Sequence, residues 1–79
     1  MSNNLSFNQV MKDMCNRIYG TNDVDSCLND DPMKARLIMR CTSYAVNILE
    51  ASGYPTVNSQ MYELVINGIG NAAITGMEG

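Results

Sequence analysis

The stretch Pro32–Ser52, PMKARLIMRCTSYAVNILEAS, decides the fold of this 79-residue chain. Asp31 is a preferred N-cap residue, Pro32 suits the first helical position, and Gly53 suits the residue after the last turn. Nothing inside the stretch would break a helix, so it predicts one helix over residues 32–52, roughly 30 Å long at 1.5 Å per residue. Its only continuous polar strip consists of Arg36, Arg40, Ser43, Asn47 and Glu50.

The rest of this helix is apolar around most of its circumference. One apolar face comprises Met33, Leu37, Cys41, Tyr44, Ala45 and Ile48, and further apolar residues extend beyond it: Ala35, Met39, Val46 and Leu49. A helix with so little polar surface is buried on more than one side. Small single domains have little core of their own, since a chain of about 60 residues buries only about 60% of its unfolded surface. The sequence therefore predicts that a second subunit covers part of this helix.

An amphipathic helix is predicted upstream, over residues 7–19. Ser6 and Gln9 form a capping box, Leu5 and Val10 can form a hydrophobic staple, and Gly20 ends the helix. Its apolar stripe comprises Phe7, Val10, Met11, Met14 and Ile18. This helix is expected to bury one face.

The connection over residues 21–31, TNDVDSCLNDD, is acidic and is interpreted as a solvated linker. A short helical turn at Asp25–Asn29 would place Val24 and Leu28 on the core. The opening of the segment resembles a calcium loop, but Leu28 replaces the required glycine and no glutamate closes the loop. No metal site is therefore predicted.

A third helix is predicted over residues 57–75, after an extended turn at Tyr54-Pro55 and a cap at Thr56 or Asn58. Its small residues recur at every fourth position and would let another helix approach closely: Gly68, Ala72 and Gly76. Gly68 and Gly70 each cost about 1 kcal/mol in a helix interior. Either packing compensates for that cost, or the helix kinks near residues 67–71.

These elements define an all-α fold in which residues 1–79 form a single helical domain. The second and third helices are expected to form an antiparallel hairpin, with the first helix packed across it. The excess of apolar surface predicts a homo-oligomer. Its contacts would use the small-residue row of the third helix and one side of the central helix, namely Met39, Val46 and Leu49.

Missing residue types narrow the function classes. The chain has no histidine, so it lacks the usual general base and the commonest metal ligand. No two acidic residues share an apolar-lined helix face, and neither an enzyme nor a cofactor site is predicted. The net charge of −3 argues against binding to duplex nucleic acid.

The cysteines and the apolar runs bear on location. Cys15, Cys27 and Cys41 are odd in number and lack CxxC spacing, so reduced thiols in a cytoplasmic protein are expected. No apolar run approaches the roughly 18 residues that would span a membrane.

The polar strip of the central helix is the candidate ligand site. Arg36 and Arg40 lie one turn apart and repel each other mildly unless an anion lies between them. Arginine suits bidentate contact with a phosphate or a carboxylate. The strip continues through Ser43 and Asn47, and two tyrosines could offer ring faces to a base: Tyr19 and Tyr44. Two alternatives stay open: the arginines pair with linker aspartates or a neighbouring subunit, and the tyrosines are core or interface residues.

The second half of the chain carries a family resemblance. From the arginine-bearing helix through Tyr54-Pro55 to Glu63 and the segment Asn71-Ala72-Ala73-Ile74, it resembles phage anti-CBASS sponges, which are oligomers of helical hairpins that sequester cyclic oligonucleotides. It departs from their pattern at Gly68 and Gly70, where bulkier residues are expected, and at Thr75-Gly76, where a basic residue is common. The resemblance implies a non-enzymatic viral counter-defence protein of the host cytoplasm that binds a cyclic di- or trinucleotide.

A rival hypothesis is a protein-binding inhibitor or adaptor that blocks a host protein through apolar helix faces. Methionine-rich surfaces adapt to such partners, and the chain has seven methionines. The expected contact patch comprises Met39, Val46, Tyr62 and Ile66.

Overall fold

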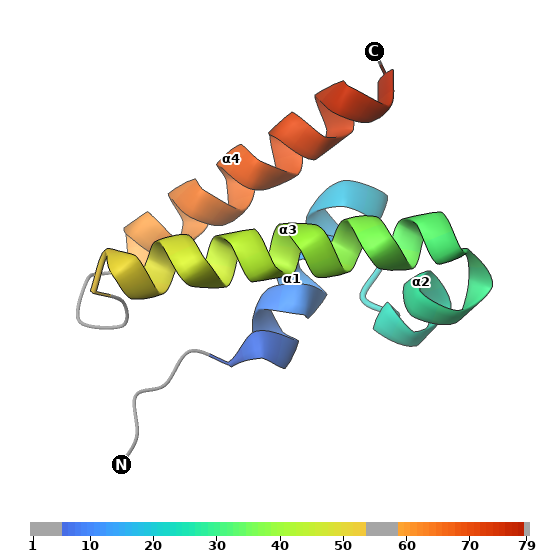
Figure 1. Cartoon of the computed structure of the whole chain (residues 1–79), viewed down its shortest axis with the longest axis horizontal. Coiled ribbons are helices and arrows are strands. Elements are labelled where there is room, and N and C mark those ends of the chain that lie inside the picture. The colour runs from blue at the N-terminus through green and yellow to red at the C-terminus, as the bar shows by residue number, and fades with distance from the viewer. Residues whose placement is uncertain (1–5, 54–58, 79) are drawn as a thin grey trace.

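The computed structural model describes residues 6–53 and 59–78 (Figure 1). This part of the chain forms four helices and no strand: α1 (Phe7–Tyr19), α2 (Val24–Asp30), α3 (Pro32–Ala51) and α4 (Ser59–Glu78). The all-α prediction is confirmed. The expected number of three helices is wrong, because the segment interpreted as a linker contains α2.

Local hydrogen bonds explain why α2 forms in an acidic segment. The carboxylate of Asp23 caps the helix by accepting from the backbone N–H of Ser26 at 3.1 Å, and the Ser26 hydroxyl donates to Asp30 at 2.8 Å. Cys27 is buried in the core, while Val24 and Leu28 pack against it. The helical turn predicted at Asp25–Asn29 therefore lies within α2, which is a helix of seven residues.

The bounds of α1 and α3 follow their capping residues. Ser6 accepts from the backbone N–H of Gln9 at 3.2 Å, and Gly20 adopts the left-handed conformation with φ 70°. Asp31 accepts from the backbone N–H of Met33 at 2.9 Å, so α3 starts at Pro32 as expected. It ends at Ala51, one residue before the predicted end.

Helix α4 is longer than predicted and runs unbroken through both interior glycines to Glu78 instead of residue 75. At Gly70 an added Cβ would lie 2.4 Å from Cγ of Arg17, so the missing side chain lets α1 approach α4. At Gly68 nothing lies within 4 Å of that position. The turn at Tyr54-Pro55 and the proposed caps before α4 lie outside the described residues.

The core lies where α1 and α2 pack against α3. α1 passes behind α3, and α2 lies at the start of α3 (Figure 1). α4 begins near the end of α3 and diverges from it along its length (Figure 1). The core cluster draws on every helix and contains Val10, Met11, Met14, Cys15, Cys27, Ile38, Cys41, Ala45 and Ile66. The antiparallel hairpin and the oligomer stay predictions, but Leu49 is wrong as an expected oligomer contact because it is fully buried within the chain.

The buried face of α3 differs from the predicted one by a rotation of roughly 80°, at 100° per residue. Met33 is 79% exposed and Tyr44 is 61% exposed, although both were placed on the buried face. The residues that are buried are Ile38, Cys41, Thr42, Ala45 and Leu49. Thr42 can lie inside because its hydroxyl donates to the carbonyl of Ile38 at 2.7 Å, which satisfies a side chain that looks polar in the sequence.

Candidate functional site

Two adjoining grooves follow α3 where α4 diverges from it. The first, called the cationic groove here, has a volume of about 640 Å³ and is lined by Tyr19, Asp31, Met33, Lys34, Arg36, Leu37, Arg40, Ala73 and Gly76. The second, called the apolar groove, has a volume of about 690 Å³ and is lined by Leu37, Arg40, Cys41, Ser43, Tyr44, Asn47, Gly68, Ile69, Ala72 and Ala73. Leu37, Arg40 and Ala73 line both grooves, which therefore form one continuous surface.

All six residues expected from the sequence line this surface. Tyr19 and Arg36 lie in the cationic groove, while Ser43, Tyr44 and Asn47 lie in the apolar groove. Arg40 belongs to both. The helical spacing of the strip explains this arrangement, because residues four apart on a helix lie on the same side.

The cationic groove concentrates positive charge in a chain whose net charge is −3. Three of the five basic residues line it: Lys34, Arg36 and Arg40. Asp31 is the acidic residue in its lining, and its carboxylate already accepts the N–H of Met33 at the start of α3. The groove is therefore lined by three basic side chains and one acidic side chain.

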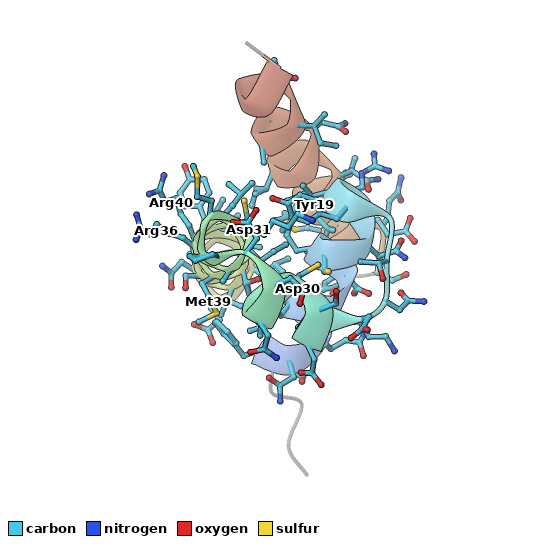
Figure 2. The ribbon with its side chains drawn as sticks, turned by 90° about the vertical axis from the view of Figure 1, so that its right-hand side faces the viewer. Tyr19, Asp30, Asp31, Arg36, Met39 and Arg40 are labelled. Atoms are coloured by element: carbon cyan, nitrogen blue, oxygen red, sulfur yellow. The ribbon has the colours of Figure 1, made fainter. Side chains whose placement is uncertain are left out.

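The arginines of the groove project outward from α3, away from Asp31 and Tyr19 (Figure 2). Neither Arg36 nor Arg40 makes a hydrogen bond or an ion pair with the described residues. One alternative was that they pair with linker aspartates. Instead, Asp23 and Asp31 cap helices, and Asp30 accepts from Ser26.

Tyr19 and Tyr44 occupy different environments. Nζ of Lys34 lies over the Tyr19 ring, 5.1 Å from its centroid, so a cation already covers one face of that ring. Burial, with smaller contributions from Cys27 and Asp31, raises the pKa of Tyr19. Tyr44 is 61% exposed beside Arg40 in the apolar groove. Of the two rings, Tyr44 is thus the better placed to stack on a ligand.

Other residues of the surface were not selected from the sequence. Lys34 is one turn before Ile38 on α3, but its place in the groove depends on how α1 and α4 pack. Ala73 and Gly76 form the wall from α4, and nothing lies within 4 Å of the position of an added Gly76 Cβ. In the sequence, Gly76 belongs to the small-residue row and Ala73 directly follows Ala72 of that row. This pattern does not identify which helix they face.

The contact patch predicted for a protein-binding inhibitor is wrong as a set of four exposed residues. Ile66 is 5% exposed and belongs to the core, and Val46 packs against that core. The hydroxyl of Tyr62 donates to the carboxylate of Asp13, which holds that ring between α1 and α4. Of the four residues, Met39 is exposed, at 42%.

The site and fold together define a small all-helical protein with a cationic groove that continues into an apolar one. No protein-family model, curated protein or solved structure matches the chain. Within residues 6–53 and 59–78, no helix combines the length and the apolar character needed to cross a membrane. In the same part of the chain, no three potential metal ligands lie together.

Proposed function

We propose that this protein is a non-enzymatic binding protein that sequesters a small cyclic oligonucleotide. The observation that carries the proposal is the pair Arg36 and Arg40. Neither has a hydrogen-bond or ion-pair partner among residues 6–53 and 59–78, and both lie on a surface that continues into an apolar groove. Arginine forks match phosphate oxygens, and a ring such as that of Tyr44 can stack on a base. A nucleotide carries both chemical features within one small molecule.

The hydroxyl of Ser43 and the amide of Asn47 add hydrogen-bonding groups in the apolar groove, where the proposal places a nucleotide base. A cyclic di- or trinucleotide has at least two phosphates and two bases, so one chain offers contacts to about half of it. A second subunit supplies the other half in this proposal. The resemblance to phage sponges adds the biological setting, a viral counter-defence role in the host cytoplasm, with antiparallel α3–α4 hairpins as the assembling unit.

Isothermal titration calorimetry against a panel of cyclic di- and trinucleotides tests the proposal. At least one member should bind, and Arg36→Ala or Arg40→Ala should weaken its binding by about 1.5–3 kcal/mol each through loss of a charge-assisted hydrogen bond. Lys12→Ala is the matched control, because Lys12 is an exposed cation of α1 that lines neither groove. The ligand should also be recovered unchanged after prolonged incubation.

Absence of heat from every panel member at tens of micromolar would refute the proposal. Equal weakening by Lys12→Ala would instead indicate attraction by overall charge.

The second candidate function is a protein-binding inhibitor or adaptor. Leu64 favours it, since this large apolar side chain on α4 is 66% exposed. A shallow surface depression of about 370 Å³ lies beside it, lined by four residues of α4: Gln60, Met61, Leu64 and Val65. Affinity purification from a bacterial lysate should then recover one stoichiometric protein, and Leu64→Glu should abolish its recovery.

A further inference from the structure

A pair of thiols lies buried between α1 and α2. Cys15 is fully buried on α1 and Cys27 is 3% exposed on α2, with their sulfur atoms 2.7 Å apart. A covalent S–S bond is about 2.05 Å long, so closure requires the sulfur atoms to approach by only about 0.7 Å. The third thiol, Cys41, lines the apolar groove. The packing therefore selects one pair out of three cysteines, which sequence spacing alone did not do.

We propose that Cys15 and Cys27 form a reversible disulfide that fastens α2 to α1 when a small-molecule disulfide such as oxidised glutathione is present. One cysteine attacks the glutathione disulfide as a thiolate, forming a mixed disulfide and releasing one glutathione thiol. The other cysteine then attacks the protein sulfur of that mixed disulfide and releases the second glutathione. In total, the protein loses two protons and two electrons, and the oxidant becomes two molecules of reduced glutathione.

Access to the buried pair requires local opening of α2. A helix of seven residues is too short to be stable by itself, so α2 depends on its contacts with the rest of the domain. Burial and the hydrogen bond with Cys27 raise the pKa of Cys15 to about 12. The reactive thiolate is therefore scarce at neutral pH, so oxidation should be slow there. It should be faster at pH 8.5, where more thiolate forms.

The cross-link would lie under one wall of the cationic groove. Cys15 is one helical turn before Tyr19 on α1, and Cys27 is four residues before Asp31, and both Tyr19 and Asp31 line that groove. Oxidation would thus fix the separation of the two segments that carry these residues. This inference does not depend on what the groove binds.

The test uses the reduced full-length chain under native conditions with oxidised glutathione at pH 8.5. Free thiols should fall from three to one, the intact mass should decrease by two hydrogen atoms, and peptide mapping should link Cys15 to Cys27. The thermal midpoint should rise by several degrees and return to its initial value after reduction. Cys41→Ser should keep the mass loss, whereas Cys15→Ser and Cys27→Ser should abolish it.

Retention of three free thiols after oxidation would overturn the proposal, as would stable glutathione adducts or a pairing that involves Cys41. Because the wild-type thiol count and peptide map are decisive, the test does not depend on the single variants being folded. Oxidation in urea provides a comparison, since an unfolded chain should give mixed pairings.

Discussion

Arg40 is the charged residue among the three that line both grooves. On one side of it, Lys34 and Arg36 line the cationic groove. On the other side, Ser43 and Tyr44 line the apolar groove. Two arginines one turn apart are mildly destabilising in an isolated helix. An anionic ligand would reverse the sign of that contribution, which is why binding is expected to depend on both arginines.

The two tyrosines should respond differently to substitution. Tyr44→Ala should weaken cyclic oligonucleotide binding by about 1–3 kcal/mol through loss of stacking, and Tyr44→Phe should retain most of the affinity. Tyr19→Phe should leave the affinity nearly unchanged, because phenylalanine keeps the ring that lies under Lys34 and the proposal assigns no ligand contact to the Tyr19 hydroxyl. Calorimetry on the three variants measures this. A Tyr44→Ala variant that binds as tightly as the wild type would contradict the assignment of Tyr44 as the stacking residue.

Cys15 makes stability sensitive to alkaline pH in the reduced protein. Its pKa rises from 9.0 to about 12, so between these values the folded state keeps a proton that the unfolded state loses. The free energy of unfolding should therefore fall as pH rises above about 9, by at most about 1.4 kcal/mol per pH unit. Burial raises the pKa of Cys41 and of Tyr19 in the same direction.

Urea denaturation at pH 8 to 10.5 with a reducing agent checks this. Cys15→Ala should flatten the decline relative to the wild type, and an unchanged slope would show that Cys15 ionises equally in both states.

The candidate site could be predicted from the sequence as far as helical spacing reaches. Arg36, Arg40, Ser43 and Asn47 recur every three to four residues, so any helix places them on one side. Lys34 and Asp31 could not be assigned in this way, because tertiary packing brings them next to the end of α4. The ring of Tyr19 lines the cationic groove, but its contact with Lys34 depends on how α1 meets α3.

At the level of elements, capping chemistry was the most informative signal. Ser6 with Gly20 marks α1 correctly, and Asp31 with Pro32 marks the start of α3. The buried face of α3 could not be predicted, because hydropathy places Thr42 outside and Met33 inside. The backbone acceptor for the Thr42 hydroxyl reverses that order, and α3 turns its other apolar side to the core.

Gly68 and Gly70 of α4 provide a matched pair of substitutions. Gly68→Ala meets no atom within 4 Å and should stabilise the domain by up to about 1 kcal/mol through helix propensity. Gly70→Ala should destabilise it or leave it unimproved, since the new Cβ would lie 2.4 Å from Cγ of Arg17. Adding Arg17→Ala to Gly70→Ala should recover the difference, because it removes the clashing atom.

Urea denaturation of the two single variants and a double-mutant cycle between positions 17 and 70 gives the measurement. Stabilisation of equal size by both alanines would contradict the close approach of α1 to α4.

The whole molecule is about two helix layers thick at its thinnest. Its shortest dimension is 17 Å between Cα positions, close to the span of two packed helix layers, since Cα atoms lie about 2.3 Å from each helix axis and packed axes are about 8–10 Å apart. Few side chains can be enclosed in such a layer, and large apolar ones remain outside: Phe7, Met33, Met39, Tyr44 and Leu64. This shape is the physical reason for expecting further burial between copies of the chain.

The oligomer is therefore expected to form along α4. Its small-residue row is open, with Ala72 exposed and nothing within 4 Å of a Cβ added at Gly68 or Gly76. Sedimentation equilibrium at micromolar concentration should give a mass that is a multiple of 8.7 kDa. Ala72→Lys should lower that mass by placing a charge in the contact, while Asn67→Lys, also exposed on α4 but lining another cleft, should not.

Both lysine variants should keep the helical circular dichroism of the wild type, because neither position is buried within the chain. A wild-type mass of 8.7 kDa would refute the oligomer, because it is the mass of one chain. If Asn67→Lys dissociates the oligomer as readily as Ala72→Lys, the contact does not follow the small-residue row. Dissociation by Ala72→Lys alone would place the second subunit against the apolar groove, which Ala72 lines together with Tyr44 and Asn47. Ligand binding should then weaken together with assembly, since the ligand would lie between subunits.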